Sequence, residues 1–245
     1  MFDSVEIIYE DNFFSRDRDC LIKDLPINNR VFVFDDYLPR TLHHWVDSYI
    51  KTQNFWSKTN EVRGDSPTGL PHHSLWGATF FRKDYELDTD VSPRQTYMAK
   101  WLDRKIQTDF GFKWVRLQYM GLNSQTMGQD GTCHMDADRD DAYSLSFLYY
   151  TNTFWNPNWG GALRLYSEQF YSGIKEDMDE FEIGRVDFKP NRLLIFDGRI
   201  PHGAEAPHPK ARYIDRRSIV LRGDEVRLVD TEEFYNANDR IYNIQ

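Results

Sequence analysis

The stretch WVRLQYMGLNSQTMGQDGTCHMDAD, residues 114–138, begins where the chain changes from helical to strand-like patterning. Apolar and polar residues alternate in its first part, residues 114–119, with the period of a half-buried β-strand. The stretch ends in His134-Met135-Asp136, and His202 follows sixty-eight residues later. His-x-Asp with a distant His is the sequence form of a site in which two imidazoles and one carboxylate hold a metal such as Fe(II).

Further candidate strands follow this stretch. Turn-forming segments such as Trp159-Gly160-Gly161, Lys189-Pro190-Asn191 and Asp197-Gly198 separate several of them. Short strands with frequent turns are typical of all-β sandwiches and barrels. The expected strands are residues 143–150, 162–166, 182–188, 192–196 and 216–222.

Two helices are expected before Trp114. The first starts near Pro39, with apolar residues at helical spacing. The second begins at a capping box in which Ser92 is the N-cap and Gln95 the third helical residue. Residues 31–34 and 75–81 read as strands, and residues 64–73 as a long loop. The apolar faces of the two helices are Leu42, Val46, Tyr49 and Ile50, then Met98, Trp101, Leu102, Ile106 and Phe110.

The elements together predict a mainly β protein with flanking helices. We expect one domain over residues 1–245, with a jelly-roll core buttressed by N-terminal α-helices. Residues 1–113 form the helix-containing support and residues 114–222 the core with the metal site. Residues 223–245 are a C-terminal extension.

The composition is that of a folded protein with an acidic surface. Aromatic residues make up 16% of the chain, enough for a large apolar core. The net charge of −9 argues against broad nucleic-acid or anionic-membrane contact, because both partners attract basic surfaces. The two cysteines, Cys20 and Cys133, exclude a disulfide framework, and no stretch has the pattern of a signal peptide or membrane span. We therefore expect a cytoplasmic protein of bacterial or viral type. The sequence leaves its oligomeric state open.

The metal site follows from strand geometry. In a strand, residues i and i+2 project from one face, so His134 and Asp136 can both point into a barrel. The third ligand then comes from a paired strand, and His202 fits because it follows an apolar run and a turn. His208 is the runner-up, but prolines on both sides favour a loop there. Cys133 is expected to face the other way and to be packed.

A second group of polar residues lies fourteen residues beyond His202, in Arg216-Arg217-Ser218. In a strand, Arg216 and Ser218 share a face, and a guanidinium beside a hydroxyl can clamp a carboxylate. Such a clamp suits the distal carboxylate of 2-oxoglutarate beside a metal centre. We interpret Arg217, on the opposite face, as a surface charge on an edge strand.

These motifs together resemble the 2-oxoglutarate- and Fe(II)-dependent oxygenase superfamily, in particular its prolyl 4-hydroxylase-like branch. The resemblance covers residues 114–222 in four ordered pieces: the His-x-Asp segment, a strand ending in Tyr-x-Asn with a Gly-Gly turn, the distal His segment LLIFDGRIPHGAEAP, and RRSIV. It implies a double-stranded β-helix core. It also implies a dioxygenase that uses Fe(II), 2-oxoglutarate and O₂, with ascorbate as an optional reductant, and releases succinate and CO₂.

Carried over residue by residue, the resemblance gives the iron to His134, Asp136 and His202. It gives the 2-oxoglutarate carboxylate to Arg216, with Tyr119 touching the same carboxylate and Ser218 as a supporting contact. The loop after Tyr119 is less glycine-rich than in the family. Lysine stands at the clamp position in animal prolyl 4-hydroxylases. Related halogenases have a small residue where Asp136 stands, so hydroxylation is favoured over halogenation.

The substrate is left open by the sequence. The branch resemblance favours a protein, peptide or amino-acid side chain such as proline. The alternatives are the same chemistry on a small metabolite, sugar or lipid-linked group, and a non-catalytic jelly-roll module that binds a metal or ligand. Asp138, Asp140 and Asp141 suggest an acidic loop at the site's mouth that disfavours anionic substrates, and Trp155 and Trp159 either cover the substrate or pack outside the barrel.

Overall fold

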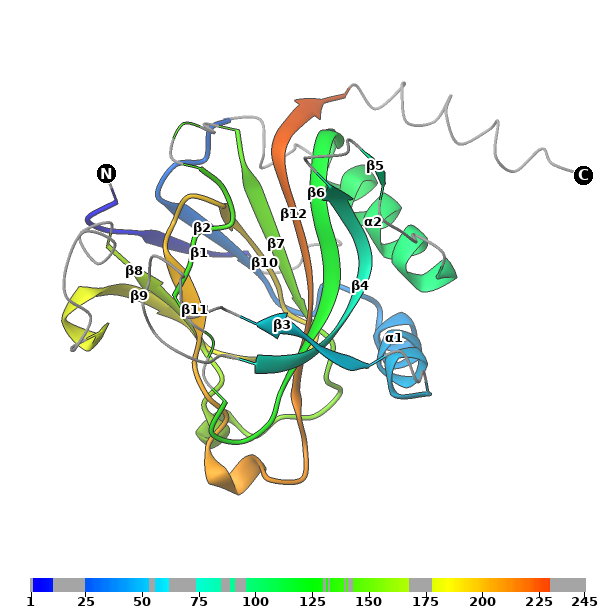
Figure 1. Ribbon diagram of the computed structural model, residues 1–245, viewed down its shortest axis with the longest axis vertical. Coiled ribbons are helices and arrows are strands. Elements are labelled where there is room, and N and C mark those ends of the chain that lie inside the picture. The colour runs from blue at the N-terminus through cyan, green and yellow to red at the C-terminus, as the bar shows by residue number, and fades with distance from the viewer. Residues whose placement is uncertain are drawn as a thin grey trace, which may run out of the picture.

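The computed structural model describes most of the chain, and its elements are strands with two longer helices (Figure 1). The described residues are 2–10, 25–52, 56–61, 74–84, 89–90, 96–129, 131, 133–138, 140, 143–167 and 178–229. In chain order the elements are β1 (Glu6–Glu10), β2 (Arg30–Phe34), α1 (Arg40–Thr52), β3 (Ser57–Glu61), β4 (Ser74–Asp84), β5 (Thr89–Asp90), α2 (Tyr97–Phe110), β6 (Phe112–Gln125), β7 (Leu145–Tyr150), β8 (Leu163–Tyr166), β9 (Glu182–Val186), β10 (Leu193–Asp197), β11 (His202–Ala204) and β12 (Arg216–Leu228), with short 3-10 helices at Pro157–Trp159, Met178–Phe181 and Pro209–Ala211.

Two sheets make up the double-stranded β-helix of the core. Within the described residues, nine strands form the larger sheet, in the order β1-β2-β10-β7-β12-β6-β4-β3, with β5 paired to β4. The smaller sheet has the order β11-β8-β9. It lies on one side of the larger sheet, and α1 and α2 lie on the other (Figure 1). The predicted fold class is thereby confirmed.

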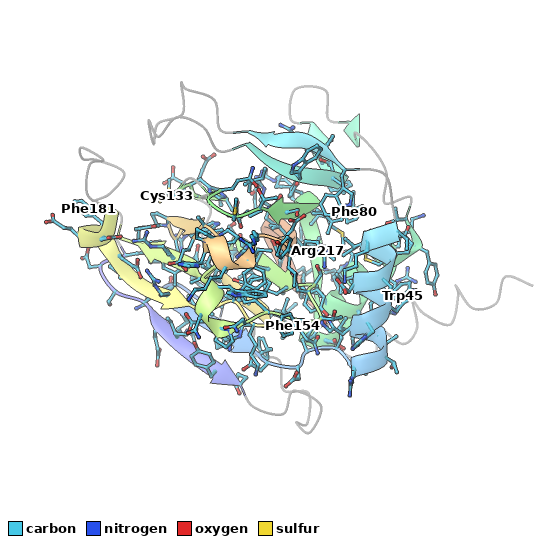
Figure 2. The ribbon with its side chains drawn as sticks, turned by 90° about the horizontal axis from the view of Figure 1, so that it is seen from below. Trp45, Phe80, Cys133, Phe154, Phe181 and Arg217 are labelled. Atoms are coloured by element: carbon cyan, nitrogen blue, oxygen red, sulfur yellow. The ribbon has the colours of Figure 1, made fainter. Side chains whose placement is uncertain are left out.

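Strands β7 and β10 are apolar except at Ser146 and Asp197. Both are central, so each face of these strands is buried. Phe147 and Ile195 pack in the cluster that includes the helices, whereas Leu148 and Phe196 pack in the cluster that includes the smaller sheet. One sheet thus separates a helical layer from a cavity-bearing β layer. Figure 2 shows Trp45 of α1 and Phe181, just before β9, at opposite sides of the molecule.

The two helices were predicted correctly, with one correction at a terminus. The N-cap of α2 is Thr96, whose side chain accepts a hydrogen bond from the Ala99 amide, and Gly111 ends the helix in the left-handed conformation. Ser92 is therefore not the N-cap; it and Gln95 lie outside the described residues, as does the expected loop 64–73. Among the described helices, none is long and apolar enough to span a membrane.

Two predicted strands are longer than expected. β6 continues past residue 119 to Gln125, and β12 continues past residue 222 to Leu228. The two strands pair along most of their length, with register irregularities after Arg222. The β6 extension adds Asn123 and Gln125 to the lining of the cavity described below. The division into a single domain with the stated boundaries stays a prediction.

Candidate metal centre

Backbone pairing brings the two histidines together. His134 and His202 form an antiparallel bridge, and each amide donates to the other's carbonyl over 2.9 Å. The distant His was thus correctly expected on a paired segment. The His-x-Asp segment itself is not a strand: Asp136 lies in a bend, and its amide donates to the Gly198 carbonyl over 2.8 Å. The turn at Gly198, rather than strand pleating, therefore aims Asp136 inward.

Three donor atoms converge at this bridge. One ligand atom from each of His134, Asp136 and His202 lies within 4.8 Å of the others. Nε2 of His134 is 3.5 Å from Oδ1 of Asp136, and Nε2 of His202 is 3.5 Å from Oδ2. Two nitrogens and one carboxylate on one side of a cavity match the donor set that Fe(II) takes in non-haem oxygenases. The residues present fit that metal.

Neighbouring groups fix the orientation of these donors. Ser146 donates to Oδ2 of Asp136 over 2.7 Å, and Nη1 of Arg222 donates to Oδ1 over 2.8 Å. Nδ1 of His202 lies 2.8 Å from the Ile200 carbonyl oxygen. A carbonyl only accepts, so this nitrogen carries the proton and Nε2 presents its lone pair to the metal position.

The protonation states also suit a metal. Burial lowers the pKa of His202 to about 4, so its imidazole is neutral at pH 7. Burial alone would raise the pKa of Asp136. Interactions with the His202 imidazole, the Arg222 guanidinium and the His134 imidazole outweigh burial and hold that pKa well below its usual value of 3.8. A deprotonated carboxylate and a neutral imidazole are the forms that coordinate metals.

Arg216 lies in a buried cradle that contains no carboxylate among the described residues. It is 2% exposed, and its three nitrogens each donate to a neutral acceptor. Nε donates to the Gly161 carbonyl over 2.7 Å, Nη1 to Oε1 of Gln125 over 2.8 Å, and Nη2 to the Tyr150 hydroxyl over 3.3 Å. Since a guanidinium has five N–H donors, two remain for a bidentate carboxylate.

The surroundings of Arg216 explain two sequence features. Its guanidinium carbon lies 5.0 Å from the ring centroid of Tyr150 and 5.2 Å from that of Phe188, so two aromatic faces hold it. Gly161, with φ of 84°, turns its carbonyl to Arg216, and a Cβ there would lie 3.1 Å from the Arg216 Cδ. The Gly-Gly turn therefore shapes the arginine's cradle.

Sequence reasoning missed Gln125 and Tyr150 as site residues. Tyr150 ends the Tyr-x-Asn strand, and that motif was the signal that could have identified it. Gln125 lies six residues past the expected end of its strand. It is opposite Arg216 in the register of β6 and β12, which only the tertiary pairing reveals.

Tyr119 lies six residues before Gln125 on β6, and its expected contact with the cosubstrate carboxylate stays a prediction. It is opposite Arg222 in the β6–β12 register, and the Arg222 guanidinium carbon lies 5.0 Å from its ring centroid. The side chains that accept hydrogen bonds from Arg216 itself are those of Gln125 and Tyr150. Ser218 lies between the two arginines on the same face of β12, is buried, and pairs with Asn123 and Tyr150.

One cavity of about 330 Å³ unites these groups. Its lining includes all six residues named from the sequence, which are His134, Asp136, His202, Arg216, Tyr119 and Ser218. Apolar side chains also line this cavity. They are Leu148, Leu163, Phe196 and Val220.

Arg217 departs from its predicted role. It was interpreted as a surface charge on an edge strand, but β12 lies between β7 and β6. Its Nη2 pairs with Oδ1 of Asp47 on α1 over 2.7 Å, and its side chain is largely buried (Figure 2). The residue therefore fastens α1 to the sheet behind the cavity.

The remaining candidates lie outside the cavity. Trp155 is buried and packs on Phe188, which supports packing rather than substrate cover. His208 is exposed and caps a 3-10 helix. Asp138 and Asp140 are exposed and do not line the cavity, and Asp141 lies outside the described residues. Cys133 is buried, as expected.

Comparison with known proteins agrees with this geometry. A family model described as the 2OG-Fe(II) oxygenase superfamily matches residues 119–221. The crystal structure of a Pseudomonas putida prolyl-4-hydroxylase superposes with a TM-score of 0.51 at 16% identity, covering 79% of this chain and 91% of that chain. A prolyl hydroxylase from Trichoplax adhaerens, in complex with a peptide fragment of the hypoxia inducible factor oxygen degradation domain, superposes with a TM-score of 0.51 at 18% identity. That alignment covers 88% of this chain and 87% of the other. No curated protein sequence matches the chain.

Proposed function

We propose, from the match of residues 119–221 to the 2OG-Fe(II) oxygenase superfamily, that this chain is a member of that superfamily and hydroxylates an unactivated C–H bond of a protein, peptide or amino-acid side chain such as proline. It is a 2-oxoglutarate-dependent dioxygenase, with Fe(II), 2-oxoglutarate and O₂ as its cofactor and cosubstrates. The structural neighbours that are prolyl hydroxylases, one of them with a bound peptide, support this substrate class.

The observation that carries the proposal is the buried Arg216 in the same cavity as the three metal donors. An arginine with only neutral partners retains its charge for an incoming carboxylate. A non-catalytic binding module needs no such group beside its metal. The second candidate is the same chemistry on a small metabolite, sugar or lipid-linked group. It differs from the first only in the class of molecule that enters the cavity.

The roles of the residues follow from their positions. His134, Asp136 and His202 would hold Fe(II), which when bound couples decarboxylation of 2-oxoglutarate to succinate with oxidation of a C–H bond by O₂. Arg216 would orient the distal carboxylate of the cosubstrate through its two remaining N–H groups. Leu148 and Val220 keep the region between Arg216 and the metal donors apolar and exclude water from it. The proton held on Nδ1 of His202 keeps Nε2 available as a ligand.

A turnover assay tests the chemistry. With Fe(II), ascorbate and 2-oxoglutarate, we expect slow succinate release even without a second substrate, and we expect proline-containing peptides to accelerate it and to gain one oxygen atom by mass spectrometry. Acceleration by small metabolites or sugars but by no peptide would favour the second candidate. A wild-type protein that binds no 2-oxoglutarate in a calorimetric titration with a redox-silent metal would contradict the whole assignment.

Removing one ligand tests the metal site. Asp136→Ala is expected to reduce metal affinity by more than the roughly 10- to 100-fold that supporting residues contribute, because it removes a ligand itself. Asp138→Ala removes the same charge from an exposed side chain two residues away and should leave metal affinity unchanged. Equal affinities in the two variants would move the site elsewhere.

A further inference from the structure

We propose that Arg82 and Arg222 form an oxyanion site at the second end of the cavity, which binds a carboxylate or phosphate group of the substrate to be hydroxylated. This proposal rests on the proposed function and specifies that the substrate carries a negative charge. It reverses the expectation, drawn from the acidic loop, that anionic substrates are disfavoured.

Strand register places the two arginines on either side of one tyrosine. Tyr119 on β6 is opposite Arg82 on β4 and also opposite Arg222 on β12. Directly opposite residues in a sheet project from the same face. All three side chains accordingly line the cavity. With neighbouring strands about 4.8 Å apart, the two arginine backbones lie roughly 10 Å apart, so both long side chains can reach one oxyanion between them.

This end of the cavity lies beside the metal donors and away from Arg216. Arg222 donates to Asp136, whereas Arg216 is six residues further back on β12. Ser218 and Val220 lie between these two arginines on β12 and also line the cavity. A cosubstrate that spans from Arg216 to the metal therefore leaves Arg82 and Arg222 on the side from which a second substrate approaches.

The charge balance of the cavity favours an anion there. Its described lining includes three arginines, Arg82, Arg216 and Arg222, against one carboxylate, Asp136. Fe(II) and dianionic 2-oxoglutarate carry equal and opposite formal charges, so their binding leaves an excess of two positive charges. An anionic group on the substrate offsets this excess in a site partly shielded from water.

The acidic side chains nearby do not cancel this excess. Asp138 and Asp140 are exposed and absent from the cavity lining. Asp136 already accepts hydrogen bonds from Arg222 and Ser146 and lies close to the two histidines. Arg82 is exposed and has no carboxylate within ion-pair distance in the part of the chain that the structure describes. It is therefore the arginine whose charge is most available to a ligand.

Binding of inorganic phosphate and acetate to the Zn(II)- and 2-oxoglutarate-loaded protein tests the site. We expect saturable binding of at least one of these probes by calorimetry, and Arg82→Gln should weaken it by roughly tenfold to a hundredfold, since a charge-assisted hydrogen bond is lost. Tighter phosphate binding would favour a phosphorylated substrate and tighter acetate binding a carboxylate. Arg104→Gln, an exposed arginine on α2, is the matched control and should change nothing.

The outcomes separate this inference from the proposed function. No saturable binding of either probe, or equal binding by wild type and Arg82→Gln, would overturn the oxyanion site while leaving the oxygenase chemistry intact. If Arg82→Gln instead weakens 2-oxoglutarate as strongly as it weakens the probe, the site belongs to the cosubstrate and the inference is wrong. Failure of 2-oxoglutarate to bind wild-type protein at all would contradict the proposed function itself.

Discussion

Arg216 and Arg222 lie on the same face of β12, yet the two ends of that face differ in every physical respect. Arg216 is 2% exposed and hydrogen-bonds only to neutral groups, between two aromatic rings. The Arg222 side chain is 35% exposed and pairs with a carboxylate that also faces both histidines. Arg216 is thus enclosed, whereas Arg222 is partly exposed and paired with Asp136.

The difference shows how one strand can serve two ligands. Burial lowers the pKa of Arg216, but guanidinium stays charged in proteins, so the desolvation cost remains until a carboxylate arrives. For Arg222, the ion pair with Asp136 already offsets the desolvation cost. A buried arginine without an ion-pair partner would favour a small dianion, and under the proposal above the partly exposed end would receive the substrate.

The largest expected effect is at the closed end. Arg216→Ala should weaken 2-oxoglutarate binding by about 2–5 kcal/mol, the usual result of removing one partner of a buried charge pair. Calorimetry with a redox-silent metal measures it. Arg212→Ala, an exposed arginine nearby, is the control. If Arg216→Ala leaves the affinity unchanged while Arg222→Ala lowers it, the assignment of the two ends is reversed.

A smaller effect is expected from the turn that supports Arg216. Gly161→Ala places a Cβ 3.1 Å from the Arg216 Cδ and should cost about 1 kcal/mol of 2-oxoglutarate affinity by displacing the guanidinium. Gly128→Ala is matched to it, because Gly128 also has positive φ but its Cβ would meet no atom within 4 Å. Both variants should lose stability from backbone strain. Only Gly161→Ala should lose affinity for 2-oxoglutarate. Equal affinities in the two variants would show that a Cβ at residue 161 does not displace Arg216.

The smallest expected effect is on the pH dependence of stability, and it concerns His43, which contacts Asn152 behind Arg216. Nε2 of His43 lies 2.8 Å from the Asn152 carbonyl oxygen, and the Asn152 side chain bonds the backbone on both sides of Arg216. Burial lowers the pKa of His43 below 6.5. The unfolded chain therefore binds the proton first, and stability present above pH 6.5 is lost as pH falls toward the folded pKa.

Chemical unfolding at pH 7 and pH 5 checks this sign. His43→Gln should show a shallower loss of unfolding free energy than wild type, by a fraction of the roughly 1.4 kcal/mol per pH unit that one proton can contribute. His44→Gln, the exposed neighbour, should keep the wild-type slope. Identical slopes in all three proteins would show that His43 contributes nothing to acid sensitivity.

The comparison of the two ends also marks the limit of sequence reasoning. His134, Asp136, His202 and Arg216 were identified because motif spacing carries them. Gln125 was missed because its strand extends beyond the alternating pattern, where Asn123-Ser124-Gln125 reads as polar loop. The contact of Tyr119 with the cosubstrate carboxylate stays a prediction, and only the β6–β12 register shows that Tyr119 is opposite Arg222. Arg217 was misread because a sequence does not show that its strand is central.

By itself, the sequence determined the class of fold and predicted the metal donors and the carboxylate clamp, because alternation, turns and ordered motifs are local or one-dimensional signals. The tertiary structure alone decided which side chains share a face of the cavity. Register across β4, β6 and β12 depends on the packing of both sheets, and a shift of one residue would turn every one of these side chains to the other face. That register places Arg82 beside Tyr119 and Arg222, and it is why the charge at the cavity mouth became visible only in the folded chain.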